Sequence, residues 1–368
     1  MGRQLLDSSP RAEYRPSSDA PVEKGLHFGQ RKLLFSEIEF LTAICSAKVD
    51  DAIVVYAGAA NGSHLPFLFG MFPSIKFVLI DPAPFCSALI EMDRRKSSSQ
   101  LLELINECCS DELCARIRKT YPVQSLYLIS DIRSGNPPDL TNWENTQLME
   151  RDNAMQASWC YSLGAKAAML KFHPPYPPTT LDDKTPDSIQ YFKGEALWGV
   201  WAPKSSTEVR LVVTGPFVDR SKLTAATYNC KAFEEQCYYY NTNGRYARDC
   251  AAERRILSRY VALTNSKESV QAISSKISTA LKTEGFQPLA DGFNEDDARL
   301  YVFLYQSRCP NPDVVYADWR GKVTKNLVLK WCALGRGCEE AIAGFWRRAS
   351  WKALSEAYSA TAQRARDQ

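Results

Sequence analysis

The alternation of short apolar runs with longer helix-like stretches is the feature that most constrains the fold of this chain. Apolar runs of strand length lie at residues 52–56, 76–80, 126–129 and 165–170. In the stretches 31–48 and 144–163, apolar residues recur at the spacing of one helix face, and the polar stretch 99–121 is also predicted to be helical. Strands that alternate with helices favour a mostly parallel sheet flanked by helices, so the predicted fold class is α/β and Rossmann-like.

Residues with special chemistry lie at the carboxyl ends of these predicted strands. In chain order they are Gly58, Asp81, Asp131 and Lys171. Ligands of such sheets bind beyond the carboxyl ends of the strands, so we expect a ligand site at this edge. Glu208 differs because it begins the next apolar run, 208–214. For Glu208 to reach the same edge, its strand must run antiparallel to its neighbours.

The remainder of the chain predicts an arm, a domain and a tail. Residues 1–24 are polar, charged and interrupted by prolines, which predicts a flexible N-terminal arm. Residues 25–336 are expected to form the α/β domain, with a largely helical insertion at about 246–290, and residues 337–368 a helical C-terminal tail. Further stretches with helical spacing lie at 266–282, 296–306, 322–333 and 341–364.

The composition excludes several classes of protein. The chain is 45% hydrophobic and 24% charged, and it has no apolar run near the roughly 20 residues that cross a bilayer, so no membrane association is expected. A net charge of +3 excludes a histone-like polycation and permits a local basic groove. The 12 cysteines and three histidines lack metal-ligand spacing. We therefore expect no metal, and free thiols in a reducing intracellular compartment, either nucleus or cytoplasm.

A turn with two glycines follows the first predicted strand. Gly58 and Gly62 let the backbone approach a ligand closely, and the helix start that follows offers free N–H donors. Asp81, at the end of the next strand, can bond the two hydroxyls of a ribose. A dinucleotide fingerprint requires G-x-G-x-x-G, whereas the spacing here is G-x-x-x-G. This favours a nucleoside cofactor without a pyrophosphate, such as S-adenosylmethionine, and the alternative is a purely structural turn.

Eight ordered blocks carry a resemblance to a known family. They are GQRKLL at 29–34, VVYAG at 54–58, GSH at 62–64, LID at 79–81, ISDIRS at 129–134, LK at 170–171, EVRL at 208–211 and YYYN at 238–241. In this order and approximate spacing the chain resembles the poxvirus-type mRNA cap 2′-O-methyltransferase, which also serves as the poly(A) polymerase processivity subunit. Relatives in this family methylate further nucleotides of the kinetoplastid cap. The resemblance implies a methyltransferase fold that uses S-adenosylmethionine, with added C-terminal helices.

The resemblance further implies catalytic and cofactor-binding residues. A Lys-Asp-Lys-Glu tetrad would consist of Lys32, Asp131, Lys171 and Glu208. Within it Lys171 would act as the general base that removes the proton of a ribose 2′-OH near the cap. The cofactor contacts would be Gln30, Tyr56, Gly58, Gly62, His64, Asp81 and Asp131. Asn61 replaces a proline of the family, and because asparagine tolerates left-handed backbone angles the turn is expected to persist.

For the cap, the resemblance implies that Tyr14 and Tyr176 stack on 7-methylguanine and that Glu234 binds its N–H edge. Pro178 stands where the family has a second carboxylate. The expected partners are capped RNA and other capping or polyadenylation proteins, with the oligomeric state left open. The alternative function is a non-enzymatic RNA-binding, processivity or assembly subunit on the same fold.

Overall fold

A seven-stranded sheet with the order β3-β2-β1-β4-β5-β8-β7 lies at the centre of the molecule. The computed structural model describes residues 3–15, 28–47, 51–134, 140–178, 180, 182–220 and 224–306. The neighbouring strands from β3 to β5 run parallel. They are β1 (Ala52–Ala57), β2 (Lys76–Ile80), β3 (Leu101–Ile105), β4 (Ser125–Ser130) and β5 (Ala167–Phe172). The predicted α/β class with a mostly parallel sheet is confirmed.

The last two strands of the sheet reverse direction. β8 (Val209–Thr214) runs antiparallel to β5, with Arg210 opposite Lys171 in the register. β7 (Glu195–Leu197) then pairs antiparallel with β8 at the sheet edge. The prediction that the strand after Glu208 runs antiparallel is therefore confirmed. This reversal places Glu208 beside the carboxyl end of β5, at the edge where β1 and β4 also end.

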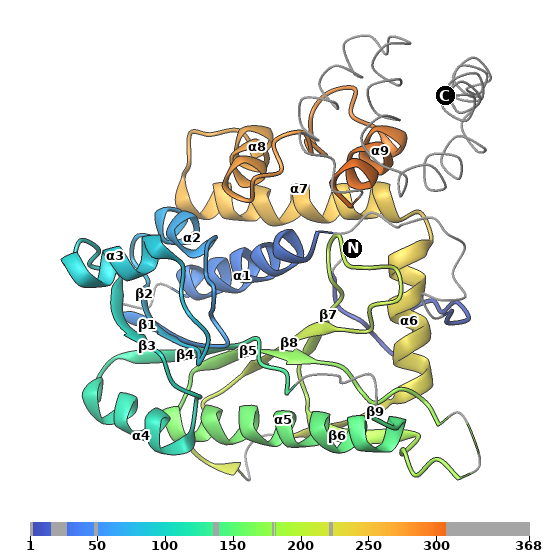
Figure 1. Cartoon of the computed structure of the whole chain (residues 1–368), viewed down its shortest axis with the longest axis horizontal. Helices are drawn as coiled ribbons and strands as arrows, with labels where there is room; N and C mark the ends of the chain where they lie inside the picture. The colour runs from blue at the N-terminus through green and yellow to red at the C-terminus, as the bar shows by residue number, and fades with distance from the viewer. Residues whose placement is uncertain are drawn as a thin grey trace, which may run out of the picture.

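Helices cover both faces of the sheet (Figure 1). On one face lie α1 (Gly29–Ser46) and α2 (Leu65–Met71), and α7 (Arg245–Thr264) packs over α1 with α8 (Val270–Ala280) beside it. The opposite face is covered by α4 (Asp111–Thr120) and α5 (Asn142–Leu163). The remaining elements are α3 (Ser87–Arg95), β6 (Ser188–Phe192), β9 (Ala225–Asn229), α6 (Cys230–Thr242) and α9 (Glu295–Gln306). None of the helices that the structure describes has the length and apolar character to cross a membrane.

The predicted helix over 99–121 is wrong in its first part. Leu101–Ile105 forms β3 and pairs parallel with β2, and α4 begins only at Asp111. The side chain of Ser110 marks this start, because it accepts a hydrogen bond from the Leu113 amide. A short apolar run has no period that separates strand from helix, so the pairing with β2 decides.

Most other predicted elements are found. The stretches 31–48, 144–163, 266–282 and 296–306 correspond to α1, α5, α8 and α9, and α7 makes the insertion mainly helical. The stretches 322–333 and 341–364, and with them the predicted tail, lie outside the described residues. Residues 3–15 of the predicted arm pack on the domain, because Gln4 bridges to Leu197 and the Leu5 amide donates to the Ala196 carbonyl. The division into arm, domain and tail stays a prediction.

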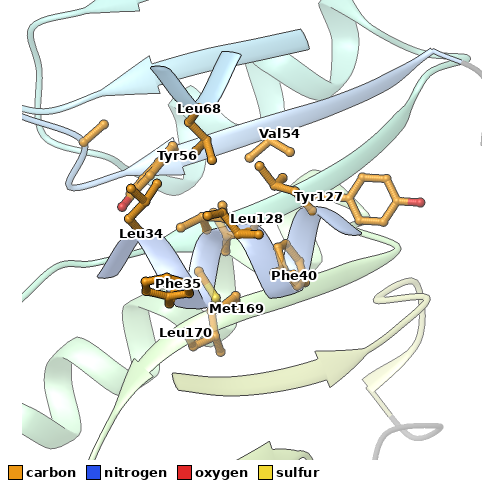
Figure 2. Close-up of a cluster of buried hydrophobic side chains, with 14 of the residues drawn as sticks. Leu34, Phe35, Phe40, Val54, Tyr56, Leu68, Tyr127, Leu128, Met169 and Leu170 are labelled. Carbon is orange, nitrogen blue, oxygen red and sulfur yellow. The ribbon is translucent and has the colours of Figure 1, made fainter. Parts of the chain in front are cut away.

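A large part of the core lies between α1 and the sheet. Leu34, Ile38 and Leu41 follow the three- and four-residue spacing of one helix face and are fully buried. Figure 2 shows Leu34 beside Tyr56 of β1, in a cluster that also contains Leu128 of β4 and Leu170 of β5. This apolar contact holds α1 against the sheet, and so it sets where the first turn of α1 meets the strand ends.

Truncation of Leu128 to alanine should lower the free energy of unfolding by about 2–5 kcal/mol, because the side chain is fully buried and the deletion leaves a cavity. Urea unfolding measures the loss. The matched control is Leu6→Ala, at a leucine that is 53% exposed, and it should change stability by no more than about 0.5 kcal/mol. Equal losses for the two variants would contradict this location of the core.

Candidate active site

Four charged side chains from separate segments meet at the carboxyl edge of the sheet. Lys32 comes from the first turn of α1, Asp131 follows β4, Lys171 lies in β5 and Glu208 precedes β8. Lys32 Nζ lies 2.5 Å from Glu208 Oε1. Lys171 Nζ lies 3.1 Å from Asp131 Oδ1 and 3.3 Å from Glu208 Oε2. The structure therefore brings together the four residues of the predicted tetrad, with the Lys171 amine between two carboxylates.

Arg210 joins this group, although it was not predicted from the sequence as a site residue. Its Nη2 lies 2.9 Å from Asp131 Oδ1 and 3.4 Å from Glu208 Oε1. The sequence contains an indication of this position. Residues two apart on a strand face the same side, and Arg210 follows Glu208 by two positions in the predicted strand. What the sequence lacked was the strand register, which sets Arg210 opposite Lys171.

Burial and charge act against each other in this cluster. Burial raises the pKa of Glu208, but the charges of Arg210, Lys32 and Lys171 outweigh it and hold that pKa well below its usual value. Burial lowers the pKa of Lys32 more than the nearby Glu208 carboxylate raises it. Glu208 is thus ionised at neutral pH, and the amine of Lys32 loses its proton more easily than that of a free lysine.

The glycine turn lies where the strand order reverses, between β1 and β4, which is where open α/β sheets bind ligands. Gly58 has a φ of 82°, and a Cβ there would lie 2.9 Å from the Asp131 carbonyl carbon, so only glycine allows this close approach. Gly62 has a φ of 69°, whereas Asn61 has no positive φ. The turn is therefore present as expected, but the expected reason, a left-handed backbone at Asn61, is wrong.

Asp81 is tied to this turn by its carboxylate. Its Oδ2 accepts a hydrogen bond of 2.9 Å from the Ala60 amide, and its Oδ1 accepts one of 2.8 Å from the Ala83 amide. A carboxylate has about four acceptor positions, so oxygen lone pairs remain for a ligand hydroxyl. Gln30 lies exposed on the first turn of α1.

Tyr56 and His64 share a buried partner that was not predicted, Glu37 of α1. Glu37 Oε1 accepts a hydrogen bond of 2.8 Å from the Tyr56 hydroxyl and lies 3.0 Å from His64 Nε2. Burial lowers the pKa of His64, but the Glu37 carboxylate raises it more, and the net pKa is raised. His64 Nδ1 is buried without a hydrogen-bond partner among the described residues. Such an atom beneath the turn is suited to a polar group of a ligand.

A polar cavity of about 250 Å³ opens beside Lys171 and Glu208. Its other lining residues are Arg133, Asn142, Asn145, Thr146, Met149, His173, Pro175, Tyr176, Ser206 and Thr207. The terminal nitrogens of Arg133 have no hydrogen-bond partner among the described residues, although Nη1 lies 3.7 Å from an Asp152 oxygen. Burial lowers the pKa of His173 to about 4, so its ring is neutral. The cavity therefore offers donors to an anionic or hydroxylated ligand.

Two of the predicted aromatic residues meet near this cavity. The ring centroids of Tyr14 and Tyr176 are 6.3 Å apart with the planes tilted by 39°, and the Tyr14 hydroxyl donates to the Ser205 carbonyl at 3.1 Å. A base stacked between two rings needs a separation of about 7–8 Å, twice the contact distance between carbon atoms. The rings must therefore move apart and align before a base fits between them.

Glu234 of α6 is the third residue of this predicted group and lies within electrostatic reach of Tyr14. Burial, and then the charge of Glu235, raise its pKa to about 7. Tyr238, one turn further along α6, packs edge-on against Tyr14 with 5.5 Å between the centroids, and it was not predicted as a site residue.

The chain is similar to proteins of a known family. A family model described as poly A polymerase regulatory subunit matches residues 6–280. The chain is 28% identical over 226 residues to a fowlpox virus protein named cap-specific mRNA (nucleoside-2′-O-)-methyltransferase, which covers 59% of this chain and 68% of that protein. It is 27% identical over 240 residues to proteins of the same name from two strains of myxoma virus. This alignment covers 62% of this chain and 65% of those proteins. The chain thus spans about two thirds of the length of these relatives.

Replacement of Arg210 by methionine should lower the free energy of unfolding at pH 7 by about 3–5 kcal/mol, because it leaves two part-buried carboxylates without this partner. The folded-state pKa of Glu208 is depressed, so its stabilising contribution is present above its usual pKa of 4.5 and is lost as the pH falls through the folded pKa. The difference from wild type should therefore shrink only below the usual pKa of 4.5, and it should be smaller at about pH 3 than at pH 7.

Urea unfolding at the two pH values measures this difference. The control is Arg116→Met, at an exposed arginine of α4, which should stay within about 0.5 kcal/mol of wild type. A pH-independent loss in Arg210→Met, or none, would contradict the proposed charge balance.

Proposed function

This chain belongs to the poly A polymerase regulatory subunit family, and we propose that it methylates the ribose 2′-OH of a cap-proximal nucleotide in capped RNA, with S-adenosylmethionine as the donor. The observation that carries the proposal is the position of Lys171. Its amine lies between the carboxylates of Asp131 and Glu208 and borders a polar cavity. The names of the viral relatives support cap 2′-O-methylation as the class of reaction.

Lys171 acts as the general base. S-adenosylmethionine supplies a methyl group that is already activated by its positive sulfur. When the ribose oxygen bonds to the methyl carbon, the bond from that carbon to sulfur would break and the donor would leave as a neutral thioether. Lys171 Nζ would take the proton of the 2′-OH, and the carboxylates of Asp131 and Glu208 would stabilise the resulting ammonium. The two oxygens of Glu208 are shared, with Oε1 on Lys32 and Oε2 on Lys171. Lys32 and Arg210 thereby orient Glu208, which in turn aims the base.

The cofactor would lie at the glycine turn. The positive φ angles of Gly58 and Gly62 shape this turn, Asp81 offers acceptors to the ribose hydroxyls, and the buried Nδ1 of His64 is available to a polar group. Gln30 lies on the first turn of α1, a few residues before Glu37. These residues fit a nucleoside with a short charged tail.

The 7-methylguanine of the cap would stack between Tyr14 and Tyr176 once the rings separate. A cationic base gains from aromatic faces, and the carboxylate of Glu234 would accept hydrogen bonds from its N–H edge. Pro178 supplies no carboxylate, so Glu234 carries this recognition. The Arg133 guanidinium, in the cavity beside Lys171, is suited to the phosphates that follow the cap.

The family description favours a second function, a non-enzymatic subunit that binds RNA and associates with polyadenylation proteins. The two functions are separable by the cofactor. A non-enzymatic subunit has no need of S-adenosylmethionine, so a wild-type protein that binds capped RNA but shows no heat of binding with this cofactor would favour the second function.

Lys171→Ala should lower kcat for methyl transfer to capped RNA by at least about 100-fold, because the variant lacks the general base. Calorimetry should show binding of S-adenosylmethionine within about twofold of wild type, since the change leaves the glycine turn intact. Lys119→Ala, at an exposed lysine of α4, is the control and should retain full activity. Wild-type turnover in Lys171→Ala would refute this base assignment.

Affinity for a 7-methylguanosine cap analogue should rise by up to about tenfold from pH 6 to pH 8. The pKa of Glu234 is raised to about 7, so the acceptor form is the minor species below that pH and the major species above it. Fluorescence titration measures the affinity. Glu234→Gln should lose this rise. Any pH dependence that remains in this variant reports the titration of the 7-methylguanine base itself. The same pH dependence in both proteins would exclude Glu234 as the cap carboxylate.

A further inference from the structure

The residue before Lys32 makes a fully buried ion pair with the helical layer. Arg31 Nη2 lies 2.5 Å from Oε1 of Glu253 in α7, and Arg31 Nε donates to Glu253 Oε2 at 3.0 Å. Neither side chain is exposed. This two-pronged contact fixes the orientation of the arginine as well as its distance. It therefore fixes the rotation of the first turn of α1, from which Lys32 extends.

The same Glu253 carboxylate also holds the loop that packs against the Lys32 side chain. We call the space between this loop and α1 the Lys32 slot. A Cβ added at Gly199 would lie 2.8 Å from Lys32 Cδ and 3.0 Å from Lys32 Cγ, so this loop packs directly on the lysine stem. Two residues further on, the indole Nε1 of Trp201 donates to Glu253 Oε2 at 2.8 Å. Glu253 thus connects the helix that carries Lys32 with the loop that confines it.

We propose that Glu253 is a positioning residue for the catalytic cluster: it holds Arg31 and Trp201, and through them it sets the place of the Lys32 amine against Glu208. This inference rests on the proposed function for its effect on turnover. It gives the helical layer of α7 and α8 a part in catalysis, although none of its residues reaches the cavity beside Lys171 among the lining residues described.

Two features argue that this network specifies a position and does more than hold the layers together. Ser274 and Ser278 of α8 take part, with Arg31 Nη2 and Nη1 donating to their hydroxyls at 3.0 and 2.9 Å. Removing two charges from water is costly, and apolar side chains would join the layers equally well, but they could slide. In addition, the Phe28 amide at the N-cap of α1 donates to the Trp201 carbonyl at 3.0 Å, so the start of the helix is tied to the same residue that Glu253 holds.

The test uses two variants that disturb the slot from opposite sides. Glu253→Gln removes the charge that pairs with Arg31, and Gly199→Ala pushes on the Lys32 stem without touching Glu253. Each should lower kcat by about tenfold or more with little change in KM for S-adenosylmethionine, because a displacement of about 1 Å can cost up to about 100-fold in rate. Tyr260→Phe is the control, since it removes a hydrogen bond from α7 to the Met71 carbonyl, away from Lys32.

A second readout does not depend on methyl transfer. NMR of lysine labelled with ¹³C at Cε, with Lys32 identified by loss of its signal in Lys32→Arg, reports the pH titration of this amine. Both slot variants should move that titration upward towards an ordinary lysine, and Tyr260→Phe should leave it unchanged. If the wild type proves to be inactive, the proposed function fails and this titration alone decides the inference.

Wild-type kcat and an unshifted Lys32 signal in folded Glu253→Gln would overturn the proposal, even if the variant melts at a lower temperature. If Glu253→Gln fails to fold, Gly199→Ala decides by the same two measurements. A loss of activity shared equally by Tyr260→Phe would also overturn it, because the effect would then belong to α7 as a whole.

Discussion

The site depends on one electrostatic constraint: two carboxylates at the sheet edge are shared by three basic side chains. Asp131 and Glu208 each contact Lys171 and Arg210, and Glu208 also contacts Lys32. In a part-buried cluster a charge without a partner is costly, so each group limits where the others can lie. The depressed pKa of Glu208 is a direct consequence, and so is the fixed direction of the Lys171 amine.

Backbone topology is what assembles this cluster. Parallel strands deliver Asp131 and Lys171 to one edge, and the reversal of β8 brings Glu208 and Arg210 to the same edge. Lys32 comes from α1, a helix that lies between the sheet and α7 (Figure 1). The apolar contact beneath α1 and the Arg31–Glu253 pair above it act on that helix from two sides. The helical layer is therefore connected through α1 to the charged cluster at the sheet edge.

Residues that were missed share a physical reason. Arg210, Glu37 and Glu253 are all charged. Glu37 makes a buried contact with Tyr56, and Glu253 makes one with Arg31, and in each pair the two residues are distant in sequence. A single sequence contains no information on which buried charges pair, because pairing depends on distances between elements. The stretch 101–105 was assigned to a helix for a related reason, since its strand character arises from pairing with β2.

The sequence by itself determined the α/β class, the edge at which the special residues gather and the antiparallel direction of the strand after Glu208. The fold class follows from local apolar periodicity. The strand direction follows from the requirement that Glu208 lie at the sheet edge where the parallel strands end. Only the tertiary structure decided the register that opposes Arg210 to Lys171, the 6.3 Å approach of Tyr14 to Tyr176 and the buried link from Glu253 to Arg31. Contacts between segments far apart in the chain are set by packing of whole elements, and no local pattern of residues encodes that distance.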